Sequence, residues 1–172
     1  MGKCRGMTES DCGEPQRGVQ PRSRLSFNAS RELVVTSPKD IVLNAWKTFS
    51  SRDADRIAAL FTEDAEWIAP KGNATAVALD HTDHMVGARQ IAHFIAQEMH
   101  RMFSGVDIAF RGVYADGDVV IVEERMRATL AGGKPYENDY CFVFTVAGER
   151  IREVREYMDT RKGWRMVFGE EA

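Results

Sequence analysis

Apolar residues recur with helical spacing near the start of the folded region. Ser37 precedes Pro38, and Asp40 lies three residues after Ser37, which is the spacing of a helix-capping box. The apolar residues after this box share one stripe of a helix, namely Ile41, Val42, Ala45, Trp46 and Phe49. We therefore predict a first helix over 38–49.

Two further helices are predicted. Asp53 is placed to cap a short helix that carries Ile57, Leu60 and Phe61. Gly87 opens a longer helix that runs to about Phe103, with an apolar stripe made of Ile91, Phe94, Ile95, Met99 and Met102. His93 and His100 fall on the side opposite this stripe, so we expect both to be exposed.

The segment between these helices has a different pattern. Residues 65–69 read as a short strand that Pro70 ends. Residues 70–86 contain no sustained apolar period, so we predict a long irregular connection there.

From Val106 onward the apolar period changes from helical to two. Four strand-like stretches occur in succession and are separated by short turn signals: 106–115, 118–130, 135–146 and 150–158. Consecutive strands joined by tight turns form an antiparallel meander. The pattern predicts an α+β fold, in which three N-terminal helices pack on a strongly curved, mainly antiparallel β-sheet around an internal pocket.

The first 36 residues differ in composition from the rest. They are rich in glycine and proline and hold only Val19 and Leu25 as branched aliphatic residues before Leu33. Such a stretch cannot bury enough apolar surface to offset the entropy of ordering it. We therefore predict a flexible tail over 1–36 and one folded domain over 37–172.

Composition and charge narrow the function classes. Hydrophobic residues make up 44% and charged residues 28% of the 172, as in a soluble globular domain, and the net charge is −3. A negative balance argues against nucleic acid as partner, and no apolar run reaches the roughly 18 residues of a membrane span. Cys4, Cys12 and Cys141 form no CxxC pair. We predict a cytoplasmic protein with no cofactor, no metal, no nucleic-acid partner and no membrane partner.

At this level of detail the chain resembles a known fold. The predicted elements follow the order α-α-β-α-β-β-β-β over about 37–162. This order, together with four motifs, resembles the cone-shaped fold of the SnoaL-like and ketosteroid-isomerase-like branch of the nuclear-transport-factor-two-like superfamily. The motifs are ALFTEDAEW at 59–67, GARQI at 87–91, FVF at 142–144 and IREVREYMDT at 151–160. This fold hosts isomerases, cyclases, hydrolases, dehydratases and binding modules, so each functional residue has to be compared separately.

The resemblance implies an aspartate base near the end of the last strand. Asp159 matches that position, and Tyr157 shares its strand face if the strand is regular. An aspartate in an apolar pocket has a raised pKa, which suits removal of a proton next to a carbonyl. Tyr157 or Tyr140 would then donate to the developing enolate oxygen. A simpler alternative is that Asp159 ends the strand and caps the next turn.

Five further residues are predicted to bind the substrate. Asn138 adds a polar point to an apolar pocket wall, and His84 lies on the predicted connection just before Gly87. Trp67, Glu124 and Arg125 complete the set. Glu123 and Arg125 share one strand face, and Glu124 lies on the other. For Glu123 and Arg125 a cross-strand ion pair is the alternative, with Glu153 and Arg155 as partners.

Two related chemistries fit the residues poorly. The positions of the base and the tyrosine of ketosteroid isomerase fall at Ala69 and Ala45, which cannot transfer a proton through their side chains, and the acid position falls at or near Tyr140. The Asp-Arg-Asp relay of limonene-epoxide-hydrolase-like members has only a loose counterpart in Glu123, Arg125 and Asp159.

Two functions therefore remain open from the sequence. The first is a small cofactor-independent enzyme, an isomerase or polyketide-cyclase-like lyase, that acts on an apolar carbonyl compound with Asp159 as base. The second is a non-catalytic module that holds a small hydrophobic ligand or partner in the same pocket. In either case we expect a homodimer, because an open sheet face with alternating apolar residues needs cover.

Overall fold

The computed structural model describes residues 36–170. The chain divides into two units, Met1–Leu33 and Val34–Ala172, and the fold given below is that of the second unit. The tail predicted over 1–36 lies, except for its last residue, outside the described residues.

The first two helices begin where their capping residues predict. Helix α1 spans Pro38–Phe49, and the Ser37 side chain accepts a hydrogen bond from the backbone N–H of Asp40. Helix α2 spans Ala54–Ala58, and the Asp53 side chain caps it by accepting from two backbone N–H groups. Both predicted helix starts are confirmed. The second helix is shorter than predicted, because Leu60 lies beyond its end and Phe61 begins the strand Phe61–Ile68.

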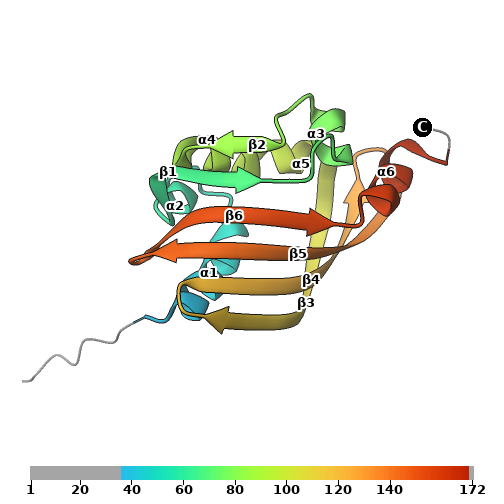
Figure 1. Ribbon diagram of the computed structural model, residues 1–172. Coiled ribbons are helices and arrows are strands. Elements are labelled where there is room, and N and C mark those ends of the chain that lie inside the picture. The colour runs from blue at the N-terminus through green and yellow to red at the C-terminus, as the bar shows by residue number, and fades with distance from the viewer. Residues whose placement is uncertain (1–35, 171–172) are drawn as a thin grey trace, which may run out of the picture. The chain divides into compact units, whose positions relative to one another are not determined.

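Six strands form one sheet, in the order β2-β1-β6-β5-β4-β3 (Figure 1). Their bounds are β1 Phe61–Ile68, β2 His84–Val86, β3 Phe103–Asp116, β4 Val119–Leu130, β5 Pro135–Ala147 and β6 Arg150–Met158. Strands β3 to β6 form the predicted antiparallel meander, and only the β1–β6 pair is parallel. The α+β fold with a curved, mainly antiparallel sheet is therefore confirmed.

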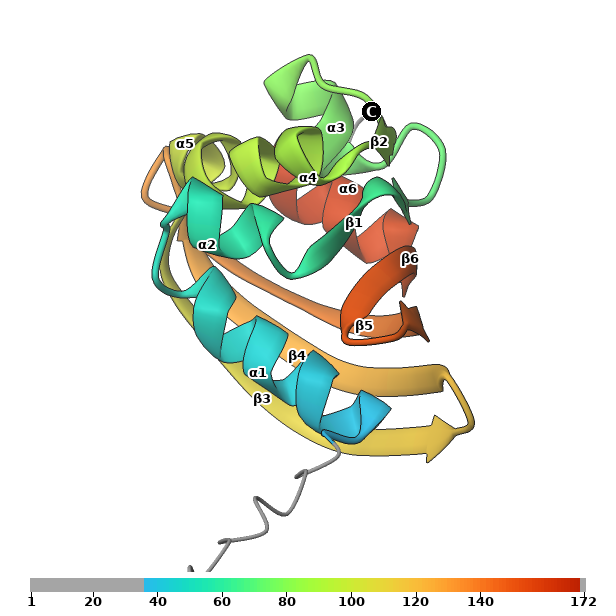
Figure 2. The ribbon, with the colours of Figure 1, turned by 90° about the vertical axis from the view of Figure 1, so that its left-hand side faces the viewer.

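Irregular pairing accompanies the bending of the long strands. The register shifts between Ser104 and Asp107, between Phe110 and Gly112, and again between Thr145 and Val146. Bulges of this kind bend a strand and increase its twist. Figure 2 shows the result, in which β3 to β6 curve around α1.

The connection 70–86 is more regular than its sequence pattern predicts. Asn73 caps helix α3 (Ala74–Leu79) by accepting from the Ala76 N–H, and residues 84–86 form β2 beside β1. The prediction of an irregular loop is wrong, because two elements of six and three residues are too short to show a period.

The third predicted helix contains a change of winding. It consists of α4 (Ala88–His93), the π-helical segment η1 (Phe94–Glu98) and α5 (Met99–Met102). A π turn takes in one more residue than an α turn, so it rotates every later side chain around the axis. His93 stays exposed, whereas His100 is half-buried and lines the interior cavity. The expectation that His100 is exposed is therefore wrong.

A sixth α-helix comes after the last strand and was not predicted. Helix α6 spans Thr160–Phe168 and lies against β5. Its Gly163 is buried, and a Cβ there would lie 3.2 Å from Nδ2 of Asn138, so the missing side chain lets the helix approach the strand closely.

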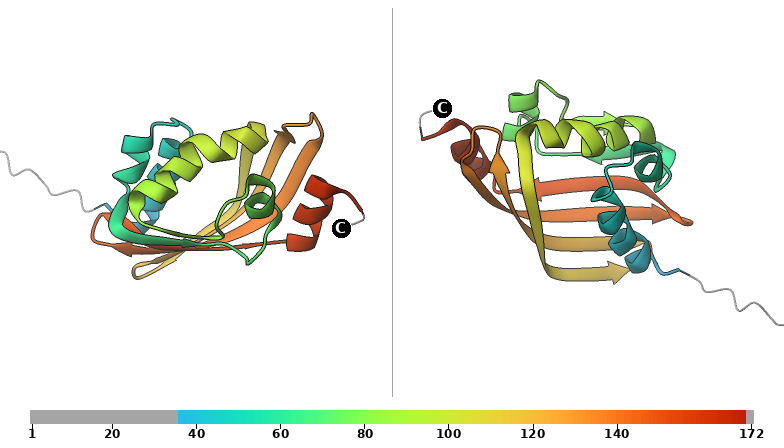
Figure 3. Two further views of the ribbon diagram at one scale, coloured as in Figure 1. Left: turned by 90° about the horizontal axis from the view of Figure 1, so that it is seen from above. Right: turned by 180° about the vertical axis from the view of Figure 1, so that it is seen from behind.

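The core lies between the sheet and the helices that cover one of its faces. Figure 3 shows the helix over 88–102 lying across that face, and α1 packs on the same face in Figure 2. The largest fully buried side chains include Phe61, Phe144, Ile57, Ile91 and Ile151. We call this covered face the inner face and the opposite one the outer face.

Candidate functional site

The packing between the inner face and the helices leaves a cavity of about 490 Å³. This volume is within the range of small-molecule sites. Most of the lining is apolar, and it comes from Trp46, Phe49, Trp67, Ala69, Ala76, Met85, Phe94, Ile95, Met99, Phe103, Gly105, Val106, Ile108, Met126 and Phe142. The polar lining is provided by Ser50, Arg52, Asn73, Thr75, Thr82, His100, Glu124, Tyr140 and Glu156.

Two carboxyl groups reach this cavity from the central strands. Glu124 of β4 lies directly opposite Tyr140 of β5, and Glu156 of β6 lies opposite Phe142 of the same strand. Because paired residues and residues two apart share a sheet face, all four side chains belong to the inner face. The strand register thus brings both acids into one apolar chamber.

Glu124 is almost completely buried, with 2% of its surface exposed. Its Oε2 atom has no hydrogen-bond partner among the described residues. Burial, with a smaller contribution from the charge of Glu156, raises the pKa of Glu124 to about 8. At neutral pH this group is therefore mostly a protonated carboxylic acid.

Glu156 has a better environment for its charge. The indole Nε1 of Trp67 donates a hydrogen bond of 2.8 Å to its Oε2. Burial raises the pKa of Glu156 to about 7, and the Trp67 hydrogen bond acts in the opposite direction. Near neutral pH Glu156 is present in both forms, as a group that exchanges protons should be.

A pair of tyrosines lies next to the acids. The hydroxyl groups of Tyr136 and Tyr140 are 2.7 Å apart, and the ring of Tyr140 stacks on Phe142 at 5.6 Å. Burial is the main reason that the pKa of Tyr140 is raised well above its ordinary value. Tyr140 therefore stays neutral and keeps a proton to donate.

Trp46 of α1 forms the aromatic wall above the strands. Its ring makes edge contacts with Phe142 at 5.4 Å and with Phe110 at 5.7 Å. Phe110 is the β3 residue directly opposite Glu124. Trp46 therefore covers the same patch of the inner face from which the Glu124 side chain projects.

Three of the predicted site residues meet in this cavity, namely Tyr140, Trp67 and Glu124. The structure places the other five elsewhere.

Asp159 is exposed and does not line the cavity. Its Oδ1 accepts a hydrogen bond of 2.9 Å from the backbone N–H of Lys162, so Asp159 is the N-cap of α6. The expectation that Asp159 faces an apolar pocket is wrong. The structure instead shows the simpler alternative, a carboxylate that ends the strand and caps the next element of the chain.

The predicted role of Tyr157 is also wrong, because its side chain lies outside the cavity. It lies opposite Cys141 on the outer face and is 54% exposed. Alternation along β6 places Glu156 and Met158 inward and Tyr157 outward, so the predicted pair has the wrong parity.

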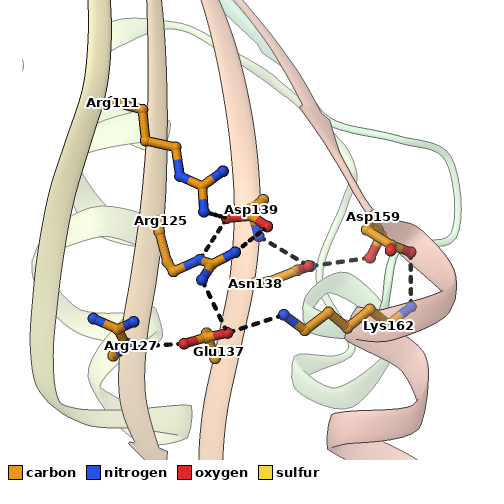
Figure 4. A network of polar contacts seen from close by, with 8 residues as sticks. All are labelled: Arg111, Arg125, Arg127, Glu137, Asn138, Asp139, Asp159 and Lys162. Atoms are coloured by element: carbon orange, nitrogen blue, oxygen red, sulfur yellow. Dashed lines mark hydrogen bonds and ion pairs between the residues drawn. The ribbon is translucent and has the colours of Figure 1, made fainter.

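Arg125 belongs to an ion-pair network on the outer face (Figure 4). Its Nε and Nη2 atoms donate to the two carboxylate oxygens of Asp139, each at 2.7 Å. The network also contains Arg127, which bonds Glu137 at 2.8 Å, and Lys162, which lies 3.3 Å from the same glutamate. Arg125 is thus in a cross-strand ion pair, but its partners are on β5 and are not Glu153 or Arg155.

Asn138 and His84 have structural contacts outside the cavity. Asn138 is fully buried, and its Nδ2 donates to the backbone carbonyl of Asp159 at 3.0 Å, which fixes the start of α6. His84 Nε2 lies 2.7 Å from Oε2 of Glu66 on the neighbouring strand. Neither residue lines the cavity, so neither is placed to bind a substrate there.

Glu156 is the functional residue that sequence reasoning missed. Ile151 and Val154 are both buried although they are three residues apart, because the register shifts between them. After this shift the inward positions are 154, 156 and 158. The apolar pair at 151 and 154, which breaks a strict period of two, was the available signal for this change of face.

No group of three His, Cys, Asp or Glu side chains within residues 36–170 is arranged to hold a metal ion. In the same part of the chain no helix has the length and apolar character that crossing a membrane requires.

Comparisons with known proteins agree with this architecture. A family model described as SnoaL-like domain matches residues 42–154. No curated protein matches the chain in sequence.

Several solved structures share the fold. An NTF2-like protein of unknown function from Burkholderia pseudomallei K96243 is 17% identical, with a TM-score of 0.66, over 77% of this chain and 98% of that one. A protein named as a SnoaL-like polyketide cyclase from Jannaschia sp. CCS1 is 17% identical, with a TM-score of 0.64, over 80% of this chain and 96% of its own.

A third structure is a protein with a ketosteroid isomerase-like fold from Catenulispora acidiphila DSM 44928, in complex with trimethylamine. It is 18% identical, with a TM-score of 0.59, over 73% of this chain and 91% of that one. At these identities the three structures are evidence for the fold alone.

Proposed function

The chain belongs to the SnoaL-like domain family, and from this premise we propose that it is a small enzyme that moves protons on an apolar carbonyl compound. The outcome would be an isomerisation or an aldol-type ring closure. One observation carries the proposal: two carboxyl groups with different environments and raised pKa values face the same apolar cavity. Pairs of this kind are typical of acid–base catalysis.

Glu156 has the role of the base. Its ionised form takes a proton from the carbon next to the carbonyl, and the electrons of that C–H bond move toward the carbonyl oxygen. Trp67 steadies the carboxylate through its indole N–H, which holds the Glu156 oxygen in place for the transfer.

Glu124 has the role of the acid. As a protonated carboxyl group it donates a hydrogen bond to the oxygen on which negative charge develops. The enolate then has two outcomes. Return of the proton from Glu156 to a different carbon of a conjugated enolate completes an isomerisation. Attack of the enolate carbon on a second carbonyl of the same molecule closes a ring, and the alkoxide oxygen formed there takes up the proton that Glu156 holds. Tyr140, opposite Glu124, is a further neutral donor on the same face.

The names of two structures with this fold are consistent with the same reaction class. One is named as a SnoaL-like polyketide cyclase, and the other is described by its ketosteroid isomerase-like fold. At 17% and 18% identity they are evidence for the fold, so the reaction class depends on the two acids of the cavity. Glu156 and Glu124 take the roles that the sequence pattern assigned to Asp159 and Tyr157.

The proposal predicts exchange of carbon-bound protons with solvent. Wild-type protein in deuterated buffer should exchange the protons next to the carbonyl of suitable apolar ketones, as followed by NMR. Replacing Glu156 with Gln should lower the rate by about 10²- to 10⁴-fold, because the base is lost. The value of kcat/KM should be greatest between the pKa values of Glu156 and Glu124, about 7 and 8.

Glu123→Gln is the matched control, since Glu123 is the exposed neighbour of Glu124 on the outer face. This variant should exchange protons at the wild-type rate. An unchanged rate in Glu156→Gln would remove the proposed base and with it the mechanism.

A binding module is the second candidate. It is favoured by Ala45, which is fully buried, and by Ala69, which lines the cavity, since both stand where the ketosteroid isomerase resemblance places catalytic groups. Ligands that bind in the cavity without any proton exchange in the wild-type protein would favour this function. A homodimer and a cytoplasmic location stay predictions.

A further inference from the structure

One side of the cavity opens between the end of α1 and the beginning of β3. Four of its lining residues are exposed there, and we call them the mouth: Ser50, Arg52, Gly105 and Val106. Ser50 and Arg52 follow the end of α1, Gly105 and Val106 belong to the first part of β3, and all four line the same cavity. Arg52 is the one charged residue of the four.

Arg52 has no ion pair with a carboxylate within residues 36–170. Its backbone is in the left-handed region, with φ of 57°, which is unfavourable for a residue with a side chain. The short turn between α1 and α2 thus holds a guanidinium group at the mouth with its charge uncompensated.

His100 lies beside this guanidinium group. The π-helical segment before α5 turns the imidazole toward the cavity, where it is half-buried. Burial and the positive charge of Arg52 together lower the pKa of His100. At neutral pH the imidazole is uncharged, so Arg52 supplies the charge at this end and His100 supplies a neutral hydrogen-bonding group.

Acidic side chains are found deeper in the cavity. Within residues 36–170 the acidic residues of its lining are Glu124 and Glu156, and both lie on the sheet. Between the two ends stand Trp46, Phe49 and other apolar side chains. Near neutral pH Glu124 is mostly protonated and Glu156 is partly ionised, so an anion meets no positive charge at the sheet and is repelled by the ionised form of Glu156. A ligand that carries a negative charge is therefore attracted at the mouth and disfavoured at the sheet, which sets the direction in which it enters.

We propose that the cavity binds an apolar acid, with the anionic group held at the mouth by Arg52 and His100 and the apolar body directed toward Glu124 and Glu156. Arginine suits this role because its planar guanidinium group binds a carboxylate or sulfonate through two parallel hydrogen bonds. The proposal rests on the proposed function in one respect: the uncharged carbonyl end of the same ligand would reach Glu156.

Two fluorescent dyes test the anionic end directly. 1-Anilinonaphthalene-8-sulfonate carries a sulfonate, and N-phenyl-1-naphthylamine has the same ring systems without it. Wild-type protein should bind the sulfonate about tenfold more tightly, in line with a hydrogen bond to a charged group. Arg52→Met should remove this preference and leave the affinity for the neutral dye unchanged. Arg52→Lys should keep part of the preference for the sulfonate dye.

Two control variants complete the experiment. Arg56→Met removes an exposed cation of α2 that does not line the cavity, and it should change neither affinity. Ala69→Phe fills part of the cavity, and it should weaken both dyes. Equal binding of the two dyes by the wild type, an unchanged preference in Arg52→Met, or full dye binding by Ala69→Phe would each overturn the proposal.

The two proposals fail in different experiments. Glu156→Gln should abolish proton exchange and retain the preference for the sulfonate dye. Arg52→Met should lose the dye preference and still exchange the protons of a neutral ketone. A wild-type protein that prefers the sulfonate but exchanges no protons would leave the anion site standing and remove the enzyme.

Discussion

Strands β4 and β5 carry carboxyl groups on both faces of the sheet, and the two faces treat them in opposite ways. On the outer face, hydrogen bonds from Arg125 hold the pKa of Asp139 below its ordinary value. Arg127 and Lys162 do the same for Glu137. On the inner face, Glu124 has no cationic partner among the described residues, and burial raises its pKa to about 8.

Glu124 and Arg125 are neighbours in sequence, and so are Asp139 and Tyr140. Asp139 on the outer face and Glu124 on the inner face therefore lie on adjacent strands, diagonal to each other, and the pKa of Asp139 is lowered whereas Glu124 mostly holds its proton at neutral pH. The residue type alone does not decide the role. The face decides it, because the face determines whether a guanidinium group or an apolar chamber surrounds the acid.

The largest effect should come from removing the inner acid. In the folded protein Glu124 keeps its proton up to about pH 8. In the unfolded chain, where its pKa has the ordinary value of 4.5, the same group is ionised throughout the window from pH 4.5 to about 8. The stability that this group provides is complete below pH 4.5 and is lost as the pH rises through that window. Glu124→Gln should then be more stable than the wild type at pH 9, by up to about 5 kcal/mol.

Denaturant unfolding between pH 2 and pH 9 measures this difference. Glu137→Gln is the control on the outer face. Its carboxylate has a lowered pKa, so its contribution is present above the ordinary pKa and lost as the pH falls. The two variants should therefore change the pH dependence in opposite directions. Parallel curves would show that the two faces do not differ as described.

A smaller effect is expected for the residue that the sequence pattern marks as catalytic. Asp159→Ala removes the side-chain cap of α6 and should cost about 1 kcal/mol of stability. Because Asp159 is exposed outside the cavity, proton exchange should continue at the wild-type rate. Asp159→Asn, which retains a capping oxygen, should lose less stability. A large loss of exchange in either variant would restore Asp159 as the base.

The smallest effect should come from the outer ion pairs. Asp139→Asn breaks the two hydrogen bonds with Arg125, but both side chains are partly open to water. The melting temperature should fall by about 3 °C or less, and the difference should shrink further in 1 M salt. Thermal melts at low and high salt measure it, and a loss that grows with salt would contradict an electrostatic origin.

The sequence contains enough local information for most of the fold. Ser37 and Asp53 mark the starts of two helices, and turn residues at 116–117 and 132–133 mark the ends of long strands. Caps and turns act within a few residues, so they can be recognised without knowledge of distant contacts.

The site depends on information that is less local. Alternation predicts which residues of β6 share a face, such as Glu156 and Met158, but does not say which set points inward. The bulge near residue 152 and the packing of α6 over the strand end decide that question. The direction of the His100 side chain is likewise not predictable from the local sequence. It depends on the π-helical segment, and no residue of that segment indicates a change of helical winding.

The π-helical segment has a consequence for how this protein can change. Removing one residue within Phe94–Glu98 would convert the π turn to an α turn and rotate His100, together with the lining residue Met99, about the helix axis. The polarity of the proposed anion site would then change through the length of one helix, without any substitution in the sheet that carries the two acids.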